Sequence, residues 1–396
     1  MDVRYWVWLQ MCLGEGARFK PIIEEFGSVK ELYSKNIIDW KMSPSLTAAQ
    51  VERLTRFSLS DAEKIILECD RNEWKIICYE DEFYPEKLRN IPNPPAVLYI
   101  DGEMPRFDAF AVIGIVGTRK ASPYAVKAAR LMAKGISLCG GIIVSGGALG
   151  VDSAAHNGAF DAGAKTYAVL GSGFGTDYLR SNKELRELIS KNGALITEYP
   201  PFVKADKTTF PMRNRIISGL SDGILVVEAG VKSGSLITAQ HAAEQGRDIF
   251  AIPASILDYN FYGTNKLLDD GATAATSPQI LLERYAGIYD TLDLSKIKTL
   301  RELAESKNSA NTKEEQQFTF DNVRHDRALR LQREEKALSL EGDERRVYNA
   351  LEDELCGIGT IIEKTGLESP KALAALTLLE MKGIAESASG KRYKLK

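Results

Sequence analysis

The sequence is poor in the residues that build covalent or metal-bound sites. Its 396 residues include five scattered cysteines, none in a Cys-x-x-Cys pair, and three histidines. An odd, scattered set of cysteines argues against a disulfide framework and a zinc site, and it favours a reducing cytoplasm. The sequence also lacks a signal-peptide pattern and any run of about 18 apolar residues. We therefore expect a cytoplasmic protein with no metal, no cofactor and no membrane association.

An excess of positive charge is also absent. The 51 Lys and Arg residues stand against 54 Asp and Glu residues, for a net charge of −3. This balance excludes a histone-like coat of cations. It does not exclude nucleic-acid binding, because a local basic patch is sufficient. The length allows two or three domains with a sizeable buried core.

Composition divides the chain into four parts. Residues 1–70 predict short helices with apolar faces. Residues 71–290 start with a connector rich in aromatics and prolines, over residues 71–108, and then alternate strand and helix, which predicts a Rossmann-like, doubly wound, mostly parallel α/β sheet. Residues 291–340 are rich in charged and amide side chains and predict a solvated linker. Residues 341–396 predict three helices and a hairpin, the order of a winged helix.

Six apolar runs predict the strands of the central sheet. The run Val112–Val116 is continuously apolar, as expected for a strand buried on both faces. Ligands of such sheets bind beyond the carboxyl ends of the strands. The predicted strands are Val112–Val116, Ile142–Ser145, Thr166–Gly171, Ala194–Thr197, Gly223–Glu228 and Asp248–Ile252.

Four glycine-rich or arginine-rich runs at that edge carry residues suited to holding phosphates. Glycine lets a backbone approach a phosphate closely, and the start of a helix offers free N–H groups at its positive end. Cations interleaved with an aromatic suit single-stranded nucleic acid, because the cations neutralise phosphates while the ring stacks on a base. The candidate binding residues are Gly117, Arg119, Ser145, Gly146, Gly147, Lys207, Phe210, Arg213, Asn214, Ser233 and Gly234.

Structural explanations stay open for these motifs. Arg119 alone is explained by a surface position after a tight turn, and Phe210 is equally well explained as a core residue among solvated charges. Asp152 could cap the helix that follows its turn, and His156 lies four residues on, on the same predicted face, which permits a metal or acid–base site. No third ligand is spaced nearby, so a hydrogen bond that holds the loop is the simpler explanation.

Both ends of the chain contain weaker nucleic-acid signals. The run Gly14–Arg18 resembles a degraded helix-hairpin-helix turn, in which backbone amides contact a DNA phosphate. The favoured interpretation is that residues 1–70 form a small helical packing domain of the helix-hairpin-helix or SAM-like type. The third helix of the winged unit offers only Lys371 and Thr377 for reading bases. We expect that unit to contact protein, or DNA phosphates weakly, rather than to read a DNA sequence.

The order of motifs resembles that of the DprA/Smf family of bacterial DNA-processing proteins. The similarity covers nearly the whole chain, helical head and winged tail included, and it is densest from Tyr84 to Ala272. The segments that carry it are Tyr84–Leu88, Ile91–Tyr99, Val116–Arg119, Ser145–Asp152 with Ala155-His156, Gly193–Pro200, Phe210–Ile217, Val227–Ala229, Ser233–Ala239, Gly263–Leu267 and Gly271-Ala272.

This resemblance implies a non-catalytic protein that binds and protects single-stranded DNA. It further implies a homodimer formed through the Rossmann-like domain, and loading of the RecA recombinase during natural transformation. The family's DNA pocket is similar at Arg119, at Lys207 and Phe210 before Arg213-Asn214, and at the Ser145-Gly146 turn. Leu149 departs from the family, which often has Arg or Lys there, and the departure removes a possible phosphate contact.

An enzymatic alternative belongs to the same fold class. Related lysine-decarboxylase-like proteins hydrolyse nucleoside monophosphates and use a Pro-Gly-Gly-x-Gly-Thr turn with a glutamate just after it. The corresponding segment here, Ser233–Ile237, places an apolar residue where that acid is needed. We therefore favour the binding protein over a phosphoribohydrolase-type hydrolase. A transcription factor that uses the winged unit is disfavoured by the poor recognition helix.

Overall fold

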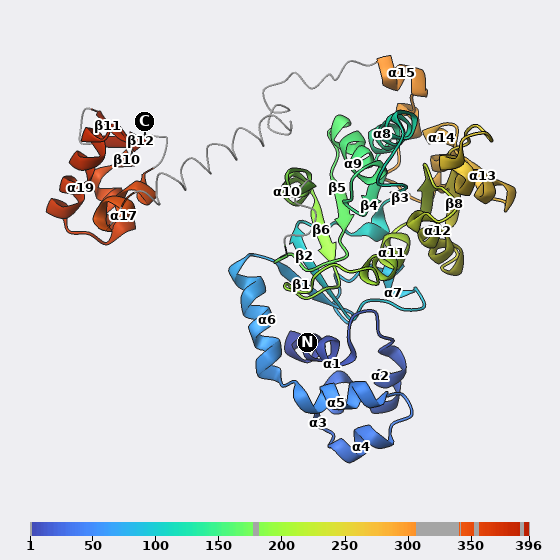
Figure 1. Ribbon diagram of the computed structural model, residues 1–396, viewed down its shortest axis with the longest axis horizontal. Coiled ribbons are helices and arrows are strands. Elements are labelled where there is room, and N and C mark those ends of the chain that lie inside the picture. Colours follow the sequence, from blue (N-terminus) through green and yellow to red (C-terminus); the bar gives the residue numbers. More distant parts are fainter. Residues whose placement is uncertain are drawn as a thin grey trace. The chain divides into compact units, whose positions relative to one another are not determined.

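The computed structural model describes residues 2–176, 182–305, 340, 342–351, 356–388 and 392–395. Contacts divide the chain into two compact units, residues 1–318 and 319–396 (Figure 1). Within the described residues, no helix combines the length and apolar character needed to cross a membrane.

A nine-stranded sheet forms the centre of the first unit, in the order β1-β2-β6-β5-β4-β3-β7-β8-β9. All neighbours from β6 to β9 pair in parallel, whereas β1–β2 and β2–β6 pair antiparallel. This arrangement confirms the predicted α/β class with a mostly parallel sheet. The strands are β1 Lys75–Cys78, β2 Val97–Gly102, β3 Val112–Val116, β4 Ile142–Ser145, β5 Thr166–Val169, β6 Ala194–Thr197, β7 Gly223–Val226, β8 Asp248–Ala251 and β9 Thr273–Ala274.

Helices cover both faces of the sheet, and successive residues of β3 point into two different cores. Ile113 and Ile115 pack with α8 and α9, whereas Val112 and Val116 pack with α11 and α12. This alternation is the two-residue period of a strand buried on both sides. The helices of this region are α7 Glu86–Arg89, α8 Pro123–Leu138, α9 Val151–Asp161, α10 Lys183–Asn192, α11 Thr209–Leu220, α12 Gly234–Glu244, α13 Tyr262–Asp269 and α14 Pro278–Leu282, with short 3₁₀ turns at Phe107–Ala109, Tyr259–Phe261 and Glu283–Tyr285.

Six helices at the N-terminus form a bundle that packs on one edge of the sheet (blue in Figure 1). Its apolar core contains Trp8 from α1 and Leu54 from α5, together with Cys78 and Tyr99 from β1 and β2. The segment expected to be a connector, residues 71–108, therefore contributes two strands and carries the bundle on them. The helices are α1 Val3–Leu13, α2 Lys20–Phe26, α3 Val29–Ser34, α4 Ile37–Met42, α5 Ala48–Arg56 and α6 Leu59–Arg71.

The first residues of the expected charged linker, 291–305, belong to the first unit instead. A 3₁₀ turn at Leu294–Lys296 and helix α15, Leu300–Glu305, continue the first unit. Leu303 is only 2% exposed, and Ile297 and Leu300 pack on the core beside α8. Apolar side chains at this spacing hold the segment on the protein. The rest of the expected linker, residues 306–339, lies outside the described residues.

The second unit is a winged helix with its own apolar core, as the sequence predicts. Strands β10 and β11 both pair with β12, and helices α17 to α19 enclose a core around Leu376 and Val347. The hairpin turn at residues 389–391 lies outside the described residues. The elements are α17 Gly342–Ala350, β10 Cys356–Gly357, α18 Ile358–Thr365, α19 Ser369–Met381, β11 Ala385–Ala388 and β12 Arg392–Leu395.

Candidate nucleic-acid interface

A pocket of about 390 Å³ opens beyond the carboxyl ends of β3, β4 and β7. The connection from β3 through α8 leads to β4 on one side, and the later strand β7 joins β3 on its other side. Such a reversal of strand order leaves a crevice, which is where doubly wound sheets bind ligands. The pocket is lined by Val116, Gly117, Thr118, Arg119, Ala148, Asp152, Phe210, Arg213, Asn214, Ile217, Ser233, Gly234, Ser235 and Thr238.

An arginine and an aromatic ring meet on one wall of this pocket. Arg119 follows β3 on the Val116–Arg119 turn and is exposed, whereas Phe210 lies half-buried in the first turn of α11. The Arg119 guanidinium carbon lies 4.6 Å from the centre of the Phe210 ring, which is a cation–π contact. The structure thus brings together a cation and a stacking surface from segments 91 residues apart.

The start of helix α12 also lines this pocket. Ser233 is the N-cap: its hydroxyl oxygen accepts the Ser235 N–H at 3.5 Å and lies 2.8 Å from the Ser235 hydroxyl. Gly234 is exposed, and its carbonyl accepts a hydrogen bond from the Asn214 side-chain amide at 3.3 Å. Because a helix N-terminus carries partial positive charge, this wall suits an anionic group.

The Ser145–Gly150 turn differs from this open wall. Ser145 is fully buried, and its hydroxyl donates a hydrogen bond to the Ile115 carbonyl at 2.6 Å. It therefore does not present the hydroxyl that the sequence suggested for ligand contact. Gly146 and Gly147 are buried as well, and neither they nor Ser145 line the pocket.

Arg213 fills the space beside this turn. Its guanidinium donates to the carbonyls of Gly146, at 2.8 Å, and Val169, and its Nε donates to the Asn214 side-chain oxygen at 3.1 Å. A Cβ atom on Gly146 would lie 2.6 Å from the Asp152 carboxylate and 2.7 Å from the Arg213 guanidinium. Glycine is thus required here by the protein's own side chains, and Arg213, although it lines the pocket, is 5% exposed.

The two groups suggested as a metal or acid–base pair do not interact with each other. The Asp152 carboxylate accepts the Ala148 N–H at 3.3 Å; burial raises its pKa, and nearby Arg213 opposes the rise. His156 pairs instead with the Thr166 hydroxyl at 2.8 Å, and burial lowers its pKa to about 3. Among the described residues, no group of three or more His, Cys, Asp or Glu side chains is arranged to hold a metal. Asp152 therefore holds the Ser145–Gly150 turn, and His156 ties α9 to the start of β5.

Two other residues singled out in the sequence lie outside the pocket lining. Lys207 is exposed on the loop before α11, and Leu149 is 39% exposed on the Ser145–Gly150 turn. Sequence reasoning missed Thr118 and Thr238, whose positions line the pocket. The signal was available for Thr238, because it lies one helical turn after Ser235 on α12.

The acid nearest the end of β7 has a structural role. Glu228 is 1% exposed, and its carboxylate accepts both the backbone N–H of Ser122, at 2.9 Å, and the Ser122 hydroxyl, at 2.5 Å. Ser122 in turn caps α8 by accepting the Ala125 N–H. The carboxylate therefore fixes the start of a helix.

Models of known protein families match both units of the chain. The family described as DNA recombination-mediator protein A matches residues 75–286, and the DprA winged helix domain matches residues 332–391. The chain belongs to the DprA family. Among curated relatives, DNA processing protein DprA of Bacillus subtilis is 38% identical over 259 residues, which is 62% of this chain and 87% of that protein.

Solved DprA structures share the fold. The X-ray structure of DprA from Streptococcus pneumoniae matches with a TM-score of 0.64 and 32% identity, over 72% of this chain and 98% of that one. A Helicobacter pylori DprA structure, titled for its single-stranded DNA binding mode, matches with a TM-score of 0.50 and 28% identity, over 55% of this chain and 97% of that one.

Proposed function

We propose that this DprA-family chain binds single-stranded DNA in the pocket between the Val116–Arg119 turn and the start of α12. The observation that carries the proposal is the Arg119–Phe210 contact, in the same pocket as a helix N-terminus, at the ligand edge of the sheet. Cations and the helix start suit phosphates, and the ring suits a base. An unpaired strand can turn a base toward the ring, whereas a duplex keeps its bases stacked inside.

The proposed role of this binding is recombination without catalysis. We infer that the chain protects incoming single strands and loads RecA onto them, as the family description of a recombination mediator suggests. Asp152 and Glu228 are engaged in structural hydrogen bonds. The segment where the hydrolase alternative needs an acid, Ser233–Ile237, contains none, and its Leu236 packs partly buried on the core. Release of adenine from AMP by the protein would revive the hydrolase alternative.

We propose that the protein dimerises through its α/β domain. The loop after β8 exposes Ile256, Leu257 and Tyr259 to 89%, 85% and 86%, and Tyr262 beside them is 54% exposed. A cluster of large apolar side chains this exposed is typical of an interaction surface. We expect sedimentation to show a dimer, and an Ile256→Asp/Leu257→Asp variant to sediment as a monomer with an unchanged circular dichroism spectrum. A monomeric wild-type protein would overturn this part of the proposal.

The main test is a titration of fluorescent oligo-dT at several salt concentrations. Affinity should fall as salt rises, because each phosphate contact releases counterions. Arg119→Ala should weaken binding and reduce the salt slope by about 0.7, the value for one single-strand phosphate contact. The matched control is Arg71→Ala, since Arg71 is 75% exposed at the end of α6. RecA filament formation on the same DNA tests the loading step.

A further inference from the structure

Two sides of helix α11 contact different parts of the molecule. Phe210, Arg213, Asn214 and Ile217 recur at helical spacing and line the pocket. On another side, Arg215 points toward the N-terminal bundle. A single rigid helix of 12 residues thus contacts both the candidate DNA pocket and the helical head.

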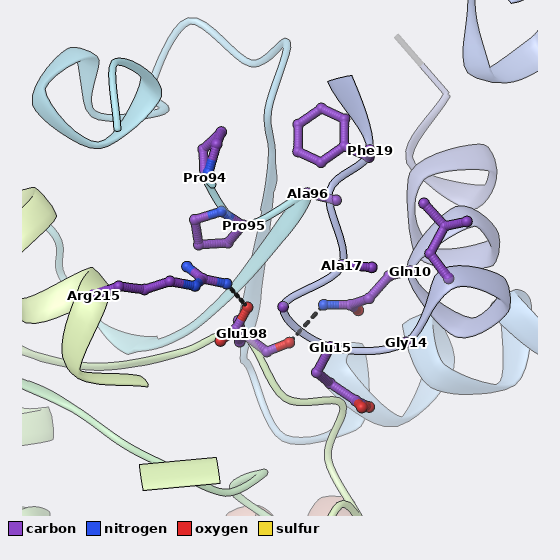
Figure 2. Close-up of a pocket in the computed structure, with 12 residues that line it drawn as sticks. Gln10, Gly14, Glu15, Ala17, Phe19, Pro94, Pro95, Ala96, Glu198 and Arg215 are labelled. Atoms are coloured by element: carbon purple, nitrogen blue, oxygen red, sulfur yellow. Dashed lines mark hydrogen bonds and ion pairs between the residues drawn. The ribbon is translucent and has the colours of Figure 1, made fainter. Parts of the chain in front are cut away.

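A buried ion pair between α11 and the segment after β6 lies beside this contact with the head. The Arg215 guanidinium donates to the Glu198 carboxylate at 2.5 Å, and these side chains are 5% and 2% exposed (Figure 2). The backbone carbonyl of Glu198 accepts a hydrogen bond from the Gln10 amide of α1 at 2.5 Å, and the Gln10 oxygen accepts one from the Tyr99 hydroxyl at 2.8 Å. Head, sheet and α11 therefore meet at one point.

The turn that resembles a helix-hairpin-helix faces this pair. In Figure 2 the segment from Gly14 to Ala17 passes beside the Glu198 carboxylate. A Cβ atom on Gly16 would lie 2.2 Å from the Met212 methyl group of α11, and the Gly16 carbonyl accepts the Asn93 amide at 2.6 Å. The turn therefore packs against α11, and its φ of 70° at residue 16 favours glycine. A protein carboxylate lies beside the turn, where a DNA phosphate would lie in a helix-hairpin-helix.

The region where Arg215, Glu198 and the Gly14–Ala17 turn meet is buried and polar. Within the described residues, the Nε and Nη1 atoms of Arg215 and the Oε1 atom of Glu198 are buried without a hydrogen-bond partner. The cavity between them measures about 10 Å³, close to the space that one water needs. Burial raises the pKa of Glu198, while Arg215 and the Gly16 N–H oppose the rise. Buried ion pairs of this kind add little net stability, because desolvation offsets their attraction, but they can fix one geometry.

We propose that Glu198 and Arg215 are positioning residues that couple docking of the helical head to single-stranded DNA binding through α11. With the head docked, the pair holds α11 in the register that places Phe210 opposite Arg119 and Arg213 beneath the Ser145–Gly150 turn. Without the Gln10 bond and the Gly14–Ala17 turn beside it, the pair gains water and constrains α11 less. The inference rests on the proposed function, since it assumes that the pocket binds DNA.

Arg215→Gln tests the coupling. We expect oligo-dT affinity to fall by about 5- to 150-fold, the usual range for coupled sites. The salt slope should stay at the wild-type value, because a 5% exposed arginine releases no counterions from DNA. This separates a positioning residue from Arg119, whose loss lowers the slope. Arg71→Gln, the same change at an exposed position, is the control and should alter neither quantity.

A second measurement tests reciprocity and covers the case in which Arg215→Gln does not fold. Coupling is symmetric, so saturating oligo-dT should slow hydrogen exchange of the amides from Gly14 to Phe19 in the wild-type protein. Gln10→Leu, a change on the head alone, should weaken oligo-dT binding in the same direction as Arg215→Gln.

The outcomes separate the two proposals. If the wild-type protein does not bind oligo-dT, the proposed function fails. If it binds, and Arg119→Ala weakens binding, but Gln10→Leu leaves affinity unchanged and DNA does not alter exchange at the turn, only the coupling fails. A reduced salt slope in Arg215→Gln would also overturn the coupling, since it would make Arg215 a direct phosphate contact.

Discussion

Two glycine-bearing turns at the same sheet edge have opposite roles. The Ser145–Gly150 turn after β4 is packed from within by Arg213 and Asp152, whereas the Ser233–Ser235 turn before α12 faces an open pocket. In sequence both consist of serine and glycine before a helix. A glycine-rich turn in the sequence thus indicates that some group approaches the backbone closely, but not whether that group belongs to a ligand or to the protein itself.

The largest expected effect is on the packed turn. Arg213→Met should lower the free energy of unfolding by about 3–5 kcal/mol. It removes a cation near the buried Asp152 carboxylate and leaves the carbonyls of Gly146 and Val169 without their donor. Urea denaturation followed by circular dichroism measures this. If the variant is as stable as the wild type but no longer binds oligo-dT, Arg213 contacts DNA directly and the contrast between the turns disappears.

A pair of identical substitutions sharpens the comparison. Gly146→Ala should lower stability by about 1–3 kcal/mol, since its methyl group collides with Asp152 and Arg213. Gly234→Ala should leave stability nearly unchanged, because no described atom lies within 4 Å of the added carbon. Thermal unfolding of both variants gives the answer. Gly234→Ala should still weaken oligo-dT binding if a phosphate approaches the helix start, and equal melting temperatures for the two variants would contradict the comparison.

The ring on the open pocket should matter for binding rather than for folding. Phe210→Ala should cost about 1–3 kcal/mol of oligo-dT binding free energy if the ring stacks on a base. Phe210→Tyr serves as the control that keeps the aromatic face. Fluorescence titration measures both variants. A loss of folded structure in Phe210→Ala would instead assign the ring to the core.

The smallest expected effect concerns the exposed tip of the packed turn. Leu149→Arg places a cation where Leu149 is 39% exposed and should raise oligo-dT affinity modestly, with a salt slope larger by about 0.7. Leu149→Gln is the uncharged control. An unchanged slope would show that DNA does not pass this tip.

The repeating α/β part was predictable because its signals are local. The buried strand Val112–Val116 appears in the structure as expected. Strands β1 and β2 were missed, because β2 joins the sheet by antiparallel pairing with β6, about 100 residues away, and β1 pairs with β2.

The site was predictable only in part, for a physical reason. In the sequence, nothing distinguishes the three arginines Arg119, Arg213 and Arg215. In the structure, Arg119 is exposed, whereas Arg213 and Arg215 are buried. Their burial follows from what packs around α11: the turn after β4 on one side and the helical head on the other. These contacts join segments that no local pattern relates.

The winged unit encloses its own apolar core, and the core clusters of the first unit contain none of its described residues. Each unit therefore holds its apolar core within its own residues. The two units can unfold at different temperatures. Evolution could also gain, exchange or lose the winged unit as one module without changes to the core of the first unit.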